Sequence, residues 1–150
     1  MCYNNSRKGD LTKVTDYYIE KFFNMAKNAS KFSDFPKQKI GAVAVYKNRI
    51  IATGYNVVKE NPLQKYYNKY RGFDTDTAKN MLHAEMMCIL RIKELDMDYY
   101  KVHIFVYREL KDGSLALAKP CPACMQAIKD LGIKNIHYTG KDSFIYEKLK

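Results

Sequence analysis

The chain has 150 residues, four cysteines and a formal charge of +10, which comes from 26 Lys and Arg against 16 Asp and Glu. One domain of this length buries about two thirds of the surface that its unfolded chain exposes, so it needs no disulfide in order to fold. No apolar run approaches the roughly 18 residues of a membrane span and no secretory leader is evident. We therefore expect a single cytoplasmic domain over residues 1–150 that makes no membrane contact.

The expected elements alternate between helices and strands along the chain. Apolar residues spaced by four, four and three predict an amphipathic helix over 12–29, with Val14, Tyr18, Phe22 and Met25 as its stripe. Two β-branched runs around Lys-Asn-Arg in 39–56 predict a strand, a tight turn and a second strand. The later elements are a helix over 83–95, a strand over 101–107, a turn and short strand over 112–118, a helix over 122–132, a strand over 133–139 and a terminal helix over 142–149.

This order predicts an α/β layered domain whose later strands can run parallel through helical crossovers. Residues 57–82 show no clear periodicity and are expected to form a long loop, which in a compact domain is usually functional or disordered.

The basic excess favours polyanionic or phosphorylated partners. A lysine-rich surface that merely keeps the protein in solution explains it equally well. Within 61–73, basic residues alternate with Tyr66, Tyr67, Tyr70 and Phe73. This segment could hold a nucleotide phosphate or stack the bases of a single strand, or it could be a packed lid; its candidate contacts are Lys65, Lys69 and Arg71.

Two cysteines lie three residues apart in the stretch "PCPAC" at 120–124. If a helix begins between them, Cys121 and Cys124 share one face and both sulfurs can reach one ion. Pro122 suits the first helical position and places Cys121 beside the N-cap. There the positive end of the helix favours the thiolate that binds metal.

The stretch "HAE" at 83–85 follows the long loop. His83 and Glu85 would point to opposite sides of a regular helix, so they can serve one site only where a helix begins. His83, Cys121 and Cys124 are then three ligands for one zinc ion, with a fourth position left for water. Glu85 is placed to act as a base beside it.

Two other uses of these residues stay open. A lone Cys-x-x-C is equally typical of redox proteins. A structural zinc would need a fourth protein ligand, for which the candidates are Cys88, His103 and His137.

His-x-Glu followed by Pro-Cys-x-x-Cys resembles the signature of the zinc-dependent base deaminases. The stretch "GAVAVYKNRIIATGYN" also resembles the first two strands of the cytidine and deoxycytidylate deaminase family, to which the tRNA adenosine deaminases are related. The resemblance implies a three-layer α/β/α domain with a central mixed sheet of about five strands, one zinc ion per chain and a homo-oligomer.

The resemblance also implies roles for single residues. His83, Cys121 and Cys124 would be the zinc ligands and Glu85 the proton shuttle. Asn56 and the backbones of Ala84 and Pro120 would contact the substrate. Lys119 departs from the small or hydroxylated residue of many relatives, and it is a further candidate for a phosphate or nucleic-acid contact.

These features predict hydrolytic deamination of a cytosine base in a nucleoside or nucleotide, such as cytidine, deoxycytidine or dCMP. A second possibility is a deaminase of cytosine or adenine in single-stranded nucleic acid or tRNA. A third, of another class, is a zinc-stabilised nucleic-acid-binding module without catalysis.

Overall fold

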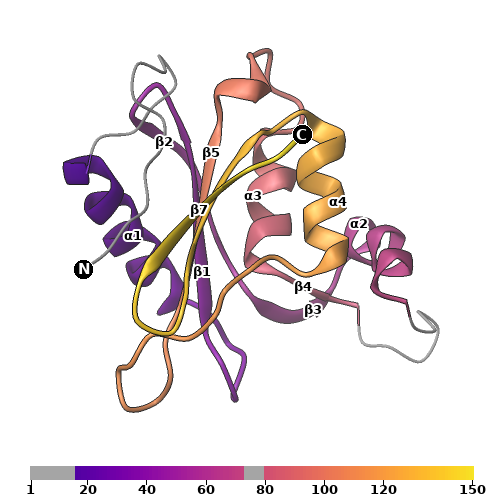
Figure 1. The fold of residues 1–150 in the computed structure, drawn as a ribbon. Helices are drawn as coiled ribbons and strands as arrows, with labels where there is room; N and C mark the ends of the chain where they lie inside the picture. The colour runs from indigo at the N-terminus through magenta and orange to yellow at the C-terminus, as the bar shows by residue number, and fades with distance from the viewer. Residues whose placement is uncertain (1–15, 73–79) are drawn as a thin grey trace.

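A computed structural model describes residues 16–72 and 80–150 (Figure 1). The first half contains α1 (Asp16–Ser30), β1 (Ile40–Tyr46), β2 (Arg49–Tyr55), β3 (Val57–Glu60), α2 (Pro62–Tyr67) and the 3-10 helix η1 (Asn68–Arg71). The second half contains β4 (Met81–Leu82), α3 (Ala84–Ile92), the 3-10 helix η2 (Tyr99–Lys101), β5 (His103–Arg108), α4 (Pro122–Leu131), β6 (Asn135–Thr139) and β7 (Phe144–Lys148).

Five strands form the central sheet, in the order β2-β1-β5-β6-β7. β5 and β6 are parallel, whereas β1–β2, β1–β5 and β6–β7 are antiparallel, so the sheet is mixed. The parallel pair is joined through α4, which is the helical crossover expected for such strands. β3 and β4 form a separate two-stranded sheet in which Val57 pairs with Leu82.

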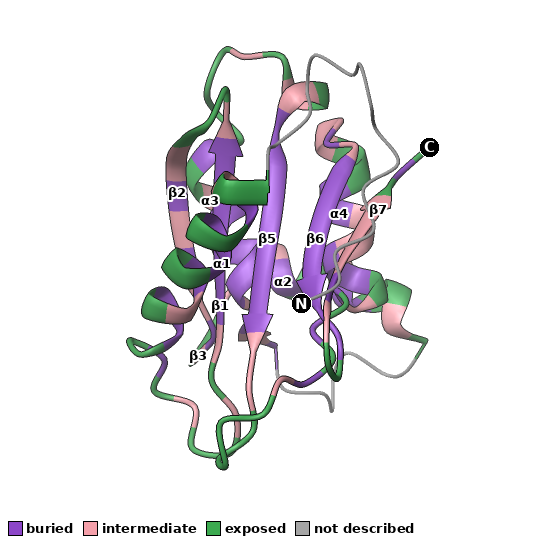
Figure 2. Ribbon diagram, turned by 60° about the vertical axis from the view of Figure 1, so that its left-hand side comes forward, coloured by how far each residue is buried: buried purple, intermediate pink, exposed green. Residues whose placement is uncertain are grey.

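Helices cover both faces of the central sheet, with α1 on one side and α3 and α4 on the other (Figure 1). Side chains alternate along β5: Phe105 and Tyr107 join the core under α1, and Ile104 and Val106 join the core under α3 and α4. β5 and β6 are buried along almost their whole length (Figure 2). The expected three-layer α/β/α domain with a five-stranded mixed sheet is thus confirmed.

The buried stripe of α1 differs from the predicted one. Phe22 is buried as expected, but Met25 is exposed, and Val14 lies outside the described residues. The helix instead buries Ile19, Phe23 and Ala26 against the sheet, and both phenylalanine rings lie within 5.3 Å of the Phe105 ring, centroid to centroid. The helix was predicted correctly, but the face that packs on the sheet is turned by about one residue position from the predicted stripe.

The prediction of a terminal helix over 142–149 is wrong, because this segment forms β7. Residues 140–143 turn the chain back and β7 pairs antiparallel with β6. Phe144 stacks on Phe23 with ring centroids 3.9 Å apart, and Tyr146 packs beside His137. Aromatic residues at every second position favour a strand with one packed face.

Two further predictions need correction. Residues 57–82 are not a single loop, because β3, α2, η1 and β4 lie within them; residues 73–79, with Phe73, are outside the described part of the chain. The short strand expected over 114–118 is reduced to one antiparallel bridge between Glu109 and Leu115. The turn between these two residues contains Gly113, where φ is +88°. The tight turn of the first hairpin is confirmed, with positive φ at Lys47 and Asn48.

Gly54 brings α3 onto the sheet. A Cβ atom at this position would lie 2.2 Å from the carbonyl oxygen of Ala84, the first residue of α3. Only glycine allows this approach, so the start of α3 lies directly against β2. Among the described helices, none is long and apolar enough to cross a membrane.

Candidate metal centre and active-site cavity

His83 is the N-cap of α3, with extended φ and ψ of −83° and 157°. The "HAE" stretch therefore straddles the start of a helix, which is the condition under which His83 and Glu85 can serve one site. His83 follows directly on β4, whose pairing with β3 fixes the approach of the chain to the helix.

The two cysteines stand at the start of α4. Cys121 is its N-cap, with φ and ψ of −65° and 165°. Pro122 occupies the first turn, where a backbone N–H would have no partner within the helix, so the missing N–H of proline costs nothing. Cys124 is on the first turn and buried. A redox Cys-x-x-C motif would be expected to follow a strand. Residues 116–121, which precede the helix, do not form one.

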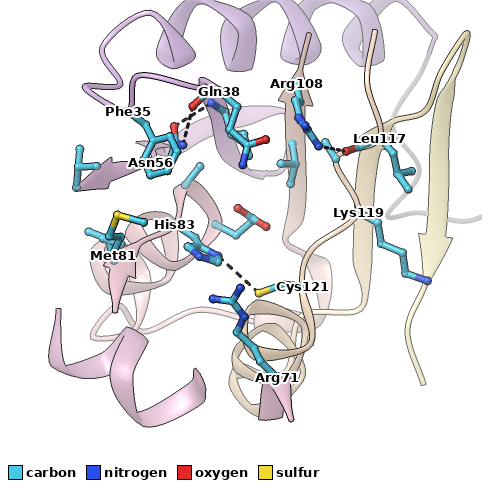
Figure 3. Close-up of a pocket in the computed structure, with 17 residues that line it drawn as sticks. Phe35, Gln38, Asn56, Arg71, Met81, His83, Arg108, Leu117, Lys119 and Cys121 are labelled. Atoms are coloured by element: carbon cyan, nitrogen blue, oxygen red, sulfur yellow. Dashed lines mark hydrogen bonds between the residues drawn. The ribbon is translucent and has the colours of Figure 1, made fainter. Parts of the chain in front are cut away.

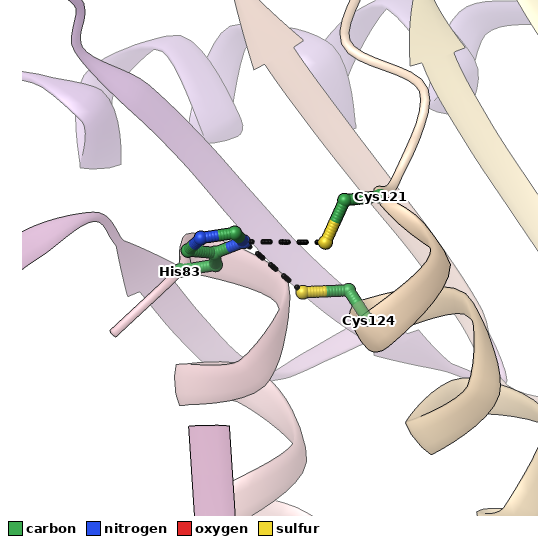
Figure 4. Close-up of side chains that lie close together, drawn as sticks. All are labelled: His83, Cys121 and Cys124. Carbon is green, nitrogen blue, oxygen red and sulfur yellow. Dashed lines mark hydrogen bonds between the residues drawn. The ribbon is translucent and has the colours of Figure 1, made fainter. Parts of the chain in front are cut away.

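The side chains of His83, Cys121 and Cys124 converge (Figure 4). Nδ1 of His83 lies 3.5 Å from Sγ of Cys121 and 3.4 Å from Sγ of Cys124. Zinc bonds of about 2.3 Å to sulfur and about 2.05 Å to nitrogen, at a tetrahedral angle, require a nitrogen–sulfur separation of about 3.6 Å. The three side chains therefore fit a zinc ion with little movement.

This trio is the one group of three or more potential metal ligands found among residues 16–72 and 80–150. His103 and His137 do not join it, because they lie on the sheet face under α1, with Nδ1 of His103 and Nε2 of His137 2.8 Å apart. Cys88 is buried within α3, where burial raises the pKa of its thiol. The described residues thus supply three ligands and leave a fourth position, as in a catalytic zinc site.

One thiol of the trio, that of Cys121, is set to bind a cation. Hydrogen bonding from Cys124 outweighs burial and, together with contact with His83, lowers the pKa of Cys121 to about 4, so this thiol is a thiolate at neutral pH. Burial lowers the pKa of His83, but the hydrogen bond with Cys121 and the charge of Glu85 more than offset this effect. The helix N-terminus at Cys121 adds to the stabilisation of the thiolate.

Glu85 is buried, with 5% of its surface exposed, and lines a cavity of about 530 Å³ together with His83 and Cys121. Burial raises the pKa of its carboxyl to about 7, although His83 opposes the shift. The carboxylate does not belong to the ligand group. It lines the same cavity as His83 and Cys121.

The cavity contains several of the predicted contacts. Asn56, Ala84, Arg71 and Lys119 line it, together with His83, Glu85 and Cys121. Pro120 is buried and lines a neighbouring hollow.

The Asn56 side chain is held on both sides by backbone. Its Oδ1 accepts a hydrogen bond from the backbone N–H of Ile40 at 2.9 Å, and its Nδ2 donates to the carbonyl of Gln38 at 3.0 Å (Figure 3). The amide therefore fixes the segment that enters β1 as part of the cavity wall.

Two of the predicted phosphate contacts lie elsewhere. Lys65 is exposed on α2, and neither it nor Lys69 lines the cavity. The ammonium of Lys69 lies 4.1 Å from the ring centroid of Tyr66 and 5.3 Å from that of Tyr70, so it packs on its own segment. Of the basic residues in 61–73, Arg71 alone reaches the cavity.

A chain of buried amides behind His83 was missed by sequence reasoning. The backbone N–H of His83 donates to Oε1 of Gln64 at 3.1 Å, Nε2 of Gln64 donates to Oδ1 of Asn68 at 2.8 Å, and Nδ2 of Asn68 donates to Oδ1 of Asn80 at 2.9 Å. Gln64 and Asn68 are fully buried.

The pair Asn61-Pro62, an N-cap followed by proline, was the signal that could have revealed α2.

Comparison with solved structures gives the same fold. The dCMP deaminase of the cyanophage S-TIM5 matches with a TM-score of 0.58 and 22% identity over 83% of this chain and 84% of that one. The cytidine deaminase from Burkholderia pseudomallei matches with a TM-score of 0.62 and 19% identity over 90% and 93% of the two chains. A search of the curated proteins found no match.

The fold and the His-Cys-Cys centre define a zinc-binding α/β protein of the deaminase type. The sequence model of the cytidine and deoxycytidylate deaminase zinc-binding region matches residues 16–139, and the chain belongs to this family.

Proposed function

We propose that the protein catalyses the zinc-dependent hydrolytic deamination of a cytosine base in a nucleoside or nucleotide. The observation that carries the proposal is that Glu85 lines one cavity with His83 and Cys121, two of the three residues of the candidate metal site. A structure of the similar cyanophage enzyme is described as a complex with dCMP and dUMP, which supports a pyrimidine nucleotide as substrate.

When bound, the zinc ion supplies a Lewis acid that makes a water molecule a better nucleophile. Glu85 takes a proton from this water and delivers it to N3 of the base as the water oxygen bonds to C4. The second proton of the same water, now on the oxygen bonded to C4, passes through Glu85 to the amino group. The C4–N4 bond then breaks and ammonia leaves, so the products are the uracil base and ammonia.

The cavity walls orient the base for this reaction. Asn56 and Ala84 line the same cavity as Glu85, and Pro120 directly precedes Cys121. We assign these groups to the sugar and the base edge. Arg71, Arg108 and Lys119 also line the cavity, so a single phosphate group on the substrate would meet basic side chains.

The same chemistry on a base within a single strand is the second candidate. A hollow lined by basic residues beside the cavity favours it. A zinc-stabilised module without catalysis is less well supported. It would have no use for a buried carboxylate beside an open metal position, because burying an ionisable group costs stability.

The test is ammonia release by the zinc-loaded chain from cytidine, deoxycytidine, dCMP, adenosine and single-stranded oligonucleotides. We expect turnover of at least one cytosine substrate and its loss in Glu85→Gln. Turnover of adenosine alone, or equal turnover by Glu85→Gln, would contradict the proposal.

A further inference from the structure

A second hollow, of about 840 Å³, opens beside the active-site cavity. Its walls are Ser30, Lys31 and residues 35–39 in the connection from α1 to β1, and residues 108–111 at the end of β5. Ile40 pairs with Arg108 in the sheet, so the two segments leave neighbouring strands at the same point. We call this hollow the basic groove.

The charge of the basic groove is strongly one-sided. Its walls carry the cations Lys31, Lys37, Lys39, Arg108 and Lys111 against one carboxylate, Glu109. The whole chain has fewer than two basic residues for each acidic one, at 26 against 16, so the groove is richer in cations than a random part of the surface.

The one acidic residue of the groove is already engaged. The carboxylate of Glu109 accepts a hydrogen bond from the hydroxyl of Tyr107 at 2.5 Å and lies 3.9 Å from the ammonium of Lys27 on α1. It therefore offers little compensation to the cations of the groove.

The basic groove leads into the active-site cavity. Phe35, Gln38 and Arg108, which are labelled on the cavity in Figure 3, also line the basic groove. Nη1 of Arg108 donates to the carbonyl of Leu117 at 3.3 Å, whereas its Nε is buried and has no hydrogen-bond partner among the described residues. The guanidinium of Arg108 therefore stands where the two hollows meet.

We propose that the basic groove binds the phosphate backbone of a single-stranded polynucleotide whose target base lies in the active-site cavity. This proposal rests on the proposed deamination at that cavity. A free nucleotide offers one phosphate group, which Arg108 and the other cavity cations can meet. Lys31, Lys37 and Lys111 line the groove but not the cavity, so they suit phosphates further along a chain. Phe35 at the junction provides a ring on which a neighbouring base can stack.

The groove is tested by fluorescence anisotropy of a labelled oligothymidine of about 12 nucleotides, a length within the usual site size, on the zinc-loaded full chain. With four phosphates neutralised, the logarithm of the affinity should fall against the logarithm of salt with a slope of about −2.8, or about 50-fold between 50 and 200 mM. Lys37→Gln with Lys111→Gln should reduce the slope to about −1.4, since each lost contact removes about 0.7.

The matched control is Lys93→Gln with Lys134→Gln, which removes the same charge from the opposite end of the sheet, beyond α3 and before β6. We expect its slope to equal that of the unmodified chain. Equal loss of slope in both double variants, or no salt-dependent binding at all, would overturn the groove proposal.

A cytosine placed within the oligothymidine separates this proposal from the proposed function. Groove-dependent deamination of that cytosine supports both proposals. Turnover of deoxycytidine without oligonucleotide binding overturns the groove alone. Groove-dependent binding without turnover of any cytosine substrate supports the groove and contradicts the deamination.

Discussion

Gln64 is predicted to hold a zinc ligand in place although it does not touch the metal. Its side chain makes two buried hydrogen bonds, one from the backbone N–H of His83 and one to Oδ1 of Asn68. Gln64→Met keeps the volume nearly constant and removes both bonds. The N–H of His83 and the amide oxygen of Asn68 are then left without these partners inside the protein.

The expected cost follows from those two groups. An unsatisfied buried donor or acceptor costs about 1–3 kcal/mol, so Gln64→Met should lower the free energy of unfolding by about 2–6 kcal/mol. Loss of a group that orients a metal ligand typically costs about 10–100-fold in metal affinity. Urea unfolding gives the first quantity, and competition with a chromogenic zinc chelator gives the second.

Asn135→Leu is the matched control. The side chain of Asn135 is also buried and makes three hydrogen bonds: it accepts one from the hydroxyl of Tyr146 at 2.7 Å and donates to the carbonyls of Tyr100 at 3.2 Å and Val102 at 3.4 Å. It lies at the start of β6, at the opposite end of the strand from the cavity. This variant should lose comparable stability and keep its zinc affinity. If Gln64→Met also keeps its zinc affinity, the amide chain supports only the fold and the reasoning about His83 is refuted.

Four further outcomes are expected. Cys121→Ala should bind zinc far more weakly in the chelator competition, because one ligand is lost and the remaining thiolate is stranded; retention of one tightly bound zinc would refute the ligand assignment. Glu85→Gln should keep its zinc by metal analysis while turnover falls by about 10²–10⁴-fold, and joint loss of zinc and activity would make Glu85 a ligand. Gly54→Ala should lower the free energy of unfolding by about 1–3 kcal/mol or more in urea, because the new methyl group meets the carbonyl of Ala84; an unchanged midpoint would contradict the close packing of α3 on β2. Arg71→Glu should raise the Michaelis constant for dCMP more than that for deoxycytidine, whereas equal effects would remove Arg71 from phosphate binding.

The metal centre could be predicted from the sequence because its geometry is local. Cys121 and Cys124 need only a helix that begins between them, and Pro122 marks that start. His83 needs only to be an N-cap, and its position ahead of an apolar run indicates this. That the two helix starts face each other depends on the fold, which the sequence suggested through a family resemblance.

The segment 61–71 was missed because it is not held by an apolar stripe. α2 and η1 are short, and their buried residues are the polar Gln64 and Asn68. A search for hydrophobic periodicity finds no signal in such a segment. The contacts that fix it are long-range, such as the hydrogen bond from the hydroxyl of Tyr67 to Asp130 on α4 at 2.9 Å.

The basic groove could not be predicted for a different reason. Lys37 and Lys111 are more than seventy positions apart, and each alone is an ordinary surface lysine. The antiparallel pairing of β1 with β5 brings their segments together, and that pairing depends on the order of strands in the completed sheet. The predicted phosphate contacts at Lys65 and Lys69 had been chosen because basic residues alternate with aromatic ones in that segment, a pattern that does not report distance to the cavity.

The arrangement of strands also explains why metal centre and groove share one edge of the domain. β5 ends at Arg108, and the chain then runs through 109–120 to Cys121, so one connection carries the groove wall at its beginning and a metal ligand at its end. The opposite walls come from the segments that precede β1 and follow β2, joined by the Asn56 amide. Phe35, Gln38 and Arg108 line both hollows, so the way out of the cavity at this edge leads into the proposed binding groove. Because this route is built from the same connections that form the cavity, a change in groove charge should alter the affinity for long substrates without displacing the metal ligands.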